Sequence, residues 1–327
     1  MNDRRARKSD RLLRVLARHE EILIVTHNNP DPDAMAAGWA LWLLAKEKFG
    51  GNVRLLASGF IARAENRHML DLLKPPLELV REMAYPAGAA VVLVDCQPGN
   101  QNHLFDEADA KIVAVVDHHP GAGWRAPFRD VRPNMAASSS LAASYLREQK
   151  IAPGARLATA LLFAIRTETR GSETHYSRLD RAVIPWLSER SDPGQLAEIE
   201  SAPLSPEYYG DLVLALQGTF LYEDTAFCLL PRASGPEIVG EVADLLIRCR
   251  SIHRVLCGAA GDNDLLVSVR TDLEDEDAGL LARDTLAGIG RGGGHRRRAG
   301  GKVPSVGPRV TETLQEELRN RWMTTCG

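Results

Sequence analysis

The chain has 327 residues, of which 44% are hydrophobic and 25% charged, which is typical of a soluble globular protein long enough for two domains. A net charge of −3 provides no overall basic field for long nucleic acids, so any anion binding must come from local clusters. The five cysteines form no Cys-x-x-Cys pair, and their odd number favours a reducing compartment over a disulfide scaffold.

The first eight residues are basic, but no long apolar core follows them, which argues against a secretory signal. No apolar run approaches the length of a membrane span. We therefore expect a cytoplasmic protein that does not enter a membrane. The residues that follow, up to about Glu20, predict a polar amphipathic helix leading into the first strand.

The first half of the chain alternates between short apolar runs and helix-like segments. Apolar runs beginning at residues 22, 53, 89 and 111 are rich in β-branched residues and predict buried strands of a parallel sheet. Between and after them, the pattern predicts helices at residues 36–49, 62–73, 141–149 and 157–165. Gly50 and Gly51 are typical of the end of the first of these helices.

A boundary is predicted where Pro, Gly and Asp gather, between about Asp192 and Pro206. Beyond it, the pattern predicts shorter strands and helices; the strands are 220–222, 225–230 and 265–270, and the helices 238–248 and 279–286. The sequence thus predicts an α/β protein with a parallel-sheet N-terminal domain (residues 1–191), a linker (192–210) and a smaller α/β C-terminal domain (211–327).

Polar side chains follow three of the predicted strands at the points where the strands end. Because the carboxyl ends of parallel strands meet at one edge of a sheet, these side chains should lie together; they are His27, Asp31, Asp33, Asp95, Asp117, His118 and His119. So many carboxylates repel one another unless cations neutralise them. Mn²⁺ and Mg²⁺ favour carboxylate oxygens, and imidazole tolerates Mn²⁺ better. The alternative is that these residues cap helices and form turns at unrelated sites.

Two further polar segments follow in the same domain. Ser138, Ser139 and Ser140 stand where a helix should start, and a capping role is the simplest interpretation. Glu168 follows the helix predicted at 157–165 and offers another carboxylate for a metal. By sequence alone, a solvated acid is the simpler reading of that glutamate.

The C-terminal domain contains a glycine-rich stretch, residues 290–301, that includes His295 and the arginine triplet Arg296, Arg297 and Arg298. Glycines expose backbone N–H groups and permit positive φ, so such a loop can bind anions, and a following helix would add its dipole. Arginine side chains bind phosphate in a bidentate manner. Arg270, at the end of a predicted strand, is a second candidate phosphate ligand. The alternative is a flexible surface loop with a solvated basic triplet.

These motifs, taken together, resemble the DHH phosphoesterase superfamily, in the branch with a C-terminal DHH-associated domain. Within it, the chain is similar to the small oligoribonuclease/pAp-phosphatase group, over nearly its whole length. The resemblance rests on residues 26–34, Val94-Asp95, Asp117-His118-His119-Pro120, Thr167-Glu168-Thr169, and Gly292–His295 with Ala299–Gly301.

The resemblance implies two Mn²⁺ ions per chain, with Mg²⁺ as a substitute. One ion would be held by His27, Asp31 and Asp95; the other by Asp33, Asp95, His118 and Glu168. His119 would contact the scissile phosphate and Asp117 would orient its neighbours. Substrate would lie in a cleft between the domains, gripped from the second domain by Arg270, Gly293, Gly294 and His295.

The resemblance implies Mn²⁺-dependent hydrolysis of short oligoribonucleotides, linear dinucleotides or pAp. Glu168 stands where relatives have aspartate, and this favours, as one alternative, a nucleotide-binding sensor without catalysis. A second alternative, a RecJ-type exonuclease, needs a longer basic groove than the balanced charge provides. A pyrophosphatase-type relative is expected to lack the 292–301 motif. Monomer and homodimer both stay open.

Overall fold

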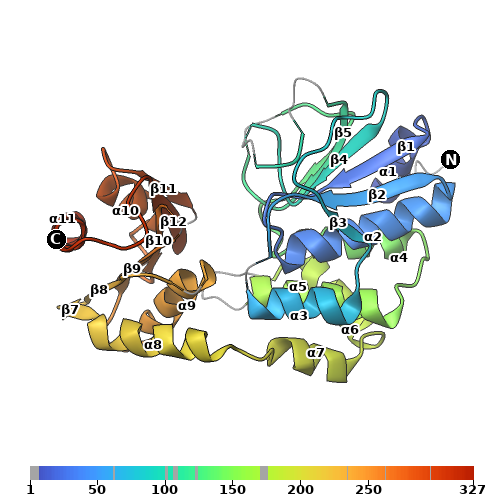
Figure 1. Cartoon of the computed structure of the whole chain (residues 1–327). Helices are drawn as coiled ribbons and strands as arrows, with labels where there is room; N and C mark the ends of the chain where they lie inside the picture. The colour runs from blue at the N-terminus through green and yellow to red at the C-terminus, as the bar shows by residue number, and fades with distance from the viewer. Residues whose placement is uncertain are drawn as a thin grey trace. The chain divides into compact units, whose positions relative to one another are not determined.

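The computed structural model describes residues 7–61, 63–99, 102–105, 110–121, 124–169, 176–233, 235–261, 263–294 and 296–327. The chain forms two compact units, Met1–Ala202 and Pro203–Gly327, shown in Figure 1. Their boundary falls inside the segment predicted as a linker. That segment is largely helical, because it contains α7 (Pro193–Glu200) and the start of α8 (Pro206–Gly218).

The first unit is built on a six-stranded sheet in which every pair of neighbouring strands is parallel. Its strands are β1 (Glu21–Val25), β2 (Asn52–Ala57), β3 (Leu77–Leu79), β4 (Ala90–Val94), β5 (Ile112–Asp117) and β6 (Phe128–Val131). Their order is β3-β2-β1-β4-β5-β6, so the chain builds outward from β1 in one direction and then, from β4, in the other. Open α/β sheets bind ligands at the carboxyl ends of the strands at such a switch point.

The helices of the first unit pack on one face of this sheet, as Figure 1 shows for α2 and α5. They are α1 (Lys8–Leu16), α2 (Pro32–Phe49), α3 (Ala64–Leu73), α4 (Ser138–Glu148), α5 (Ala155–Glu168), α6 (Arg178–Ser188) and α7. Alternate strand residues such as Ile24 and Val92 face these helices, while Leu23 and Leu93 face a second core closed by loop residues such as Phe105. The predicted α/β class and parallel sheet are confirmed.

Helix α2 follows β1 after a six-residue turn (26–31), and its sequence explains where it starts and stops. Asp31 is the N-cap, its side chain accepts a hydrogen bond from the Ala34 backbone, and Pro32 occupies the first turn. Gly50 ends the helix with a left-handed φ of 62°. The cap therefore fixes Asp31 at the carboxyl edge of the sheet, two residues before Asp33.

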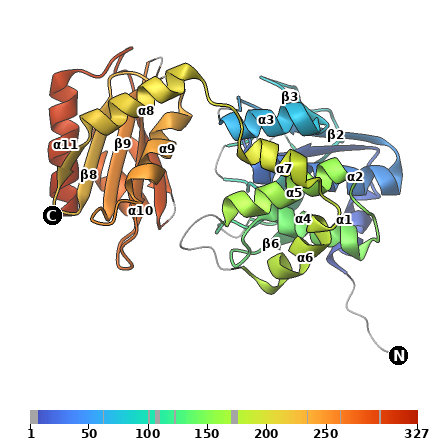
Figure 2. The same ribbon diagram turned by 90° about the horizontal axis from the view of Figure 1, so that it is seen from below.

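The second unit has a mixed six-stranded sheet with the order β11-β12-β10-β9-β8-β7, in which only β8 and β9 are parallel among the described strands. Figure 2 shows its helices against the sheet. In chain order after α8 come β7 (Phe220–Tyr222), β8 (Thr225–Leu230), α9 (Glu237–Leu246), β9 (Arg254–Ala260), β10 (Leu265–Thr271), α10 (Ala278–Thr285), β11 (Arg291–Gly294), β12 (Arg298–Val303) and α11 (Glu312–Cys326). Helices α8 and α9 cover one core, and α10 and α11 the other.

The glycine-rich stretch differs from the predicted anion-binding loop. Its glycines lie on the antiparallel strands β11 and β12, and no helix begins at its end. Packing explains two of them: a Cβ on Gly292 would lie 2.5 Å from the Ala282 carbonyl oxygen, and a Cβ on Gly301 would lie 3.0 Å from the Arg291 carbonyl oxygen and would displace the Leu286 side chain. The glycines thus let α10 approach the hairpin closely.

Two sequence-based expectations concern the whole chain. All five cysteines are free thiols, as the composition indicated. Across the described residues, no helix has both the length and the apolar character that crossing a bilayer demands.

Candidate metal centre

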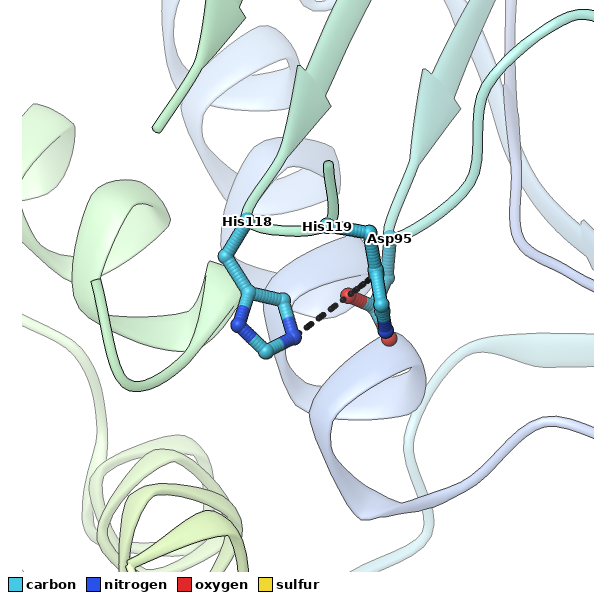
Figure 3. A group of neighbouring side chains, drawn as sticks. All are labelled: Asp95, His118 and His119. Atoms are coloured by element: carbon cyan, nitrogen blue, oxygen red, sulfur yellow. Dashed lines mark ion pairs between the residues drawn. The ribbon is translucent and has the colours of Figure 1, made fainter. Parts of the chain in front are cut away.

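Asp95 lies at the centre of the predicted site, directly after β4 and 3% exposed. Its φ of 57° is left-handed, a conformation that costs a non-glycine residue about 1–3 kcal/mol and occurs most often at functional sites. Figure 3 shows His118 and His119 beside it. His118 Nε2 lies 3.5 Å from Asp95 Oδ1, and His27 Nε2 lies 3.6 Å from Asp95 Oδ2. The two carboxylate oxygens thus face different histidines.

The rings of His27 and His118 are oriented in the same way. His27 Nδ1 lies 2.9 Å from the Asn28 carbonyl oxygen, and His118 Nδ1 lies 3.3 Å from that of Met135. A carbonyl accepts but cannot donate, so each Nδ1 carries a proton, and Nε2 is the ring nitrogen left to bind a metal. This is the arrangement of metal-ligating histidines. Both Nε2 atoms lie beside Asp95.

Asp31 adds a second carboxylate on the His27 side. Its Oδ1 lies 3.8 Å from His27 Nε2, and His27, Asp31 and Asp95 offer ligand atoms within 4.8 Å of one another. Asp95, His118 and His119 form a second group of the same kind. Asp95 is common to both groups, which is the pattern expected of a carboxylate that bridges two ions.

Asp33 is buried and bound by the first turn of α4. Its Oδ2 accepts a hydrogen bond from the Ser138 backbone N–H at 2.7 Å, and its Oδ1 accepts one from that of Ser139 at 2.8 Å. The prediction that the serines cap α4 is wrong: the N-cap is Ala137, without a side-chain cap, and Asp33 satisfies the helix N–H groups instead. Asp33 Oδ2 also lies 3.7 Å from His118 Nε2.

Ser138 belongs to the site, although the sequence alone did not indicate it. Its hydroxyl donates a 2.8 Å hydrogen bond to Asp95 Oδ1. The contact joins residues 43 positions apart, so no local spacing could reveal it. The contact arises because α4 starts at the carboxyl edge of the sheet, beside Asp95.

Two carboxylates of this cluster have a raised pKa. Burial and the charge of Asp95 raise the pKa of Asp33 to about 7. Burial, together with the charges of Asp31, Asp33 and Asp95, raises the pKa of Glu168 to about 9. Glu168 ends α5 and is half-buried, so the solvated-acid interpretation is wrong. A bound cation would remove the repulsion that these pKa values report.

The histidine pKa values show the same surplus of negative charge. Burial lowers the pKa of His27, but hydrogen bonds and charges from Asp31 and Asp95 outweigh it and raise the pKa to about 11. For Asp31, burial raises the pKa, but His27 outweighs it and holds that pKa well below its usual range. In the absence of metal, protonated imidazole therefore neutralises part of the acidic cluster.

Asp117, at the end of β5, organises the second histidine group. Its Oδ1 accepts hydrogen bonds from the backbone N–H of His118 at 2.8 Å and from Nδ1 of His119, also at 2.8 Å. Its Oδ2 accepts a 2.7 Å hydrogen bond from Gln97, which also donates to the His119 carbonyl oxygen. Gln97 is a buried supporting residue that the sequence analysis did not identify. The arrangement is consistent with the orienting role predicted for Asp117.

The candidate substrate residues lie in the second unit. Arg270 is 7% exposed, and its guanidinium donates to Asp244 Oδ1 at 2.6 Å and to Ser268 Oγ at 2.7 Å. Gly293 and Gly294 lie on β11, and His295 lies outside the described residues. Their predicted contact with substrate stays a prediction.

The donor set fits Mn²⁺. It combines carboxylate oxygens, which hard divalent cations prefer, with two imidazoles whose Nδ1 atoms face carbonyl oxygens, so that Nε2 is the atom turned toward the metal site. Cys96, the nearest thiol in sequence, has its pKa raised well above the usual range by burial and by Asp95, so it stays protonated and contributes no thiolate.

Comparisons with known proteins agree with this geometry. The model of the DHH family, N-terminal domain, matches residues 21–165. A probable manganese-dependent inorganic pyrophosphatase of Streptococcus agalactiae is 28% identical over 283 residues, covering 80% of this chain and 86% of that protein. The crystal structure of an exopolyphosphatase-related protein from Bacteroides fragilis superposes with a TM-score of 0.76 at 15% identity, covering 99% and 98% of the two chains, and shows that the fold is shared.

An uncharacterized protein of Methanocaldococcus jannaschii is 30% identical over 285 residues, which is 86% of this chain and 58% of that protein. The chain thus spans under two thirds of the length of this relative. Residues 21–165 cover β1 to most of α5, and so include every strand of the parallel sheet and all the histidines and aspartates around Asp95. Residues 21–165 of the first unit therefore match the N-terminal domain of the DHH family, and a second α/β unit follows them in the chain.

Proposed function

We propose that this protein is a metal-dependent phosphoesterase that hydrolyses short oligoribonucleotides, linear dinucleotides or pAp. The observation that carries the proposal is the position of Asp95, whose two oxygens face different histidines at the switch point of a parallel sheet. A carboxylate shared in this way supports a site for two cations. The name of the Streptococcus agalactiae relative supports manganese as the ion.

Six residues would hold the ions in this proposal. His27, Asp31 and Asp95 form one group; Asp33, Asp95, His118 and Glu168 form the other. When bound, the pair of ions supplies positive charge to phosphoryl oxygens and an acidified water. Asp33 already accepts two backbone hydrogen bonds, which fix its carboxylate without occupying all of its lone pairs.

His119 is the residue proposed to contact the scissile phosphate. Burial lowers its pKa, but the hydrogen bond to Asp117 and the charge of Asp95 outweigh it and raise the pKa to about 9. Without metal, the ring is therefore protonated at neutral pH. Asp117 accepts the hydrogen bond from Nδ1 of His119 and so fixes the orientation of the ring. The opposite nitrogen, Nε2, can then donate a hydrogen bond to a phosphate oxygen.

The nucleotide part of the proposal rests on the second unit. The β11–β12 hairpin carries arginines next to glycines, which have no side chain to cover the backbone N–H groups. The side chain of Arg298 is half exposed. Arginines can bind a second phosphate or stack on a base. The pyrophosphatase name of the Streptococcus agalactiae relative favours a second candidate substrate, inorganic pyrophosphate.

A substrate panel tests the proposal. Purified protein with Mn²⁺ is assayed on pAp, a linear dinucleotide, a short oligoribonucleotide, inorganic pyrophosphate and an aryl phosphodiester. We expect turnover of at least one nucleotide substrate and little of pyrophosphate. Turnover of pyrophosphate alone would replace the nucleotide proposal, and tight nucleotide binding with no turnover and no bound metal would indicate a sensor.

Ser138→Ala is expected to lower activity about 10-fold, in the range for residues that support a metal ligand. The change removes the hydroxyl that donates to Asp95 Oδ1, but it leaves the backbone N–H that binds Asp33. The matched control is Ser140→Ala, because the buried Ser140 Oγ has no hydrogen-bond partner among the residues that the structure describes. Steady-state kinetics at saturating Mn²⁺ should separate the two variants; equal activities would show that the Ser138 hydroxyl plays no part.

Glu168→Asp is expected to keep or raise activity, because aspartate supplies the same charge at the position where resembling sequences carry it. Glu168→Gln should weaken Mn²⁺ binding, since the amide retains size but loses charge. Mn²⁺ titrations of turnover measure both effects. If Glu168→Asp loses most of its turnover while Glu168→Gln keeps native turnover and native Mn²⁺ affinity, the carboxylate is not a ligand.

A further inference from the structure

The second unit exposes an apolar surface along α8 and β7, here called the apolar edge. Its seven side chains are between 40% and 57% exposed: Tyr209, Val213, Leu214, Leu216, Phe220, Leu221 and Tyr222. The described residues include thirteen exposed large hydrophobic side chains, so more than half of them fall within one stretch of fourteen residues. Scattered apolar side chains are ordinary on a protein surface, whereas a concentrated patch marks an interaction site.

The apolar edge wraps around the end of the sheet, because Leu221 lies on the face of α8, whereas Phe220 and Tyr222 point to the other face. Ala215 of α8 packs in the same core as Ala226 of β8, so α8 covers that face of the sheet. Leu221 is the register partner of Ala226 and points to the same face. The exposed side of α8 and the exposed Leu221 therefore lie on one side of the sheet, and Figure 1 shows β7 beside α8.

Strand β7 is the last strand of its sheet, and its three residues are all exposed. It pairs with β8 on one side, which leaves the backbone N–H and C=O groups on the other side unpaired within the sheet. Proteins commonly protect such edges by keeping them very short or with lysine, proline or a bulge. Strand β7 is short, but Phe220-Leu221-Tyr222 contains no charge and no proline, so its side chains do not oppose pairing with another strand.

We infer that the partner of the apolar edge is a second copy of this chain. In this dimer, β7 pairs with its copy in an antiparallel manner about a two-fold axis at Leu221. Phe220 then lies opposite Tyr222 of the second copy, and the two Leu221 residues lie opposite each other. An isologous interface needs this self-complementarity, and the three-residue strand provides it without placing like charges opposite one another.

The area is adequate for a stable dimer. Seven side chains that are about half exposed, each contributing on the order of 100 Å², offer roughly 700 Å² per copy, near the ~800 Å² per partner of a standard interface. Three of the seven are aromatic, the residue type enriched at the centres of interfaces. The inference depends on the second unit alone and is independent of the proposed catalytic activity.

Light scattering coupled to size-exclusion chromatography tests the inference on the full chain. We expect the mass of a dimer for the native protein, and a monomer for Leu221→Lys and for Val213→Glu, each of which places a charge on the apolar edge. Leu280→Lys is the matched control, because Leu280 is 51% exposed on α10, outside the edge, and should stay dimeric. Circular dichroism confirms that the variants are folded, as expected for substitutions of exposed side chains.

Cross-linking gives the register. In a Cys249→Ser background, which removes the exposed native thiol, Leu221→Cys should form an intermolecular disulfide under mild oxidation, and Leu280→Cys should not. A monomeric native protein at micromolar concentration would overturn the inference and would mean that the first unit or another protein covers the edge. A dimer that survives both charged substitutions would overturn it too, because the dimer would then use a different surface.

Discussion

Asp95→Asn is expected to lower kcat by about 10³–10⁴-fold, the scale seen when one member of an interdependent catalytic group is lost. The side chain keeps its size, but one of its two anionic oxygens becomes an amide nitrogen. In the native site, one oxygen faces His27 and the other faces His118 and accepts from Ser138. An amide cannot serve both sides, so the two metal groups lose their common ligand. Turnover of the best panel substrate at saturating Mn²⁺ measures the effect.

Asp71→Asn is the matched control, because Asp71 lies on α3 with its side chain exposed. Its kinetics should equal those of the native protein. The expected loss in Asp95→Asn should appear without unfolding, since the substitution also removes repulsion among buried acids. If Asp95→Asn keeps more than a tenth of native kcat, the shared carboxylate is not essential and the site must be reassigned.

Manganese is expected to stabilise the first unit strongly. The free cluster contains four carboxylates whose mutual repulsion and burial raise the pKa of Asp33 to about 7 and that of Glu168 to about 9, and a cation relieves this cost only in the folded state. At 100 times its Kd, one bound ion contributes about 2.7 kcal/mol, which corresponds to about 5–10 °C in Tm for a unit of this size. Thermal denaturation of chelated and Mn²⁺-loaded protein measures the shift.

The same experiment on Asp95→Asn provides the control, because the variant should lose most of the shift. Chelation should also abolish turnover in the native protein, and Mn²⁺ should restore it. An unchanged Tm upon addition of Mn²⁺, combined with metal analysis showing less than one ion per chain, would contradict the assignment of a metal centre.

The sheet and its acidic edge could be predicted from the sequence because both follow from local pattern. Apolar β-branched runs indicate buried strands, and an acid or histidine directly after such a run must lie at the carboxyl edge. Asp95 and Asp117 were found in this way. The short strands β3 and β6 were missed, since three or four residues carry too little periodicity to stand out from loops.

The support of the site could not be predicted, because it depends on contacts between distant segments. Ser138 and Ser139 look like caps, and only the packing of α4 against the start of α2 shows that they bind Asp33 instead. Gln97 stands two residues after Asp95, but nothing in its neighbourhood indicates that it bonds Asp117. The sequence pattern of the glycine-rich stretch predicts an anion-binding loop. In the structure, Gly292 and Gly301 instead allow close packing against the end of α10.

Anomalous diffraction from crystals soaked in Mn²⁺ tests the central claim most directly. We expect two peaks about 4 Å apart, the spacing of two-metal sites, with Asp95 between them, His27 beside one peak and His118 beside the other. A map without a peak within ligand distance of Asp95, or with manganese bound only elsewhere, would contradict it.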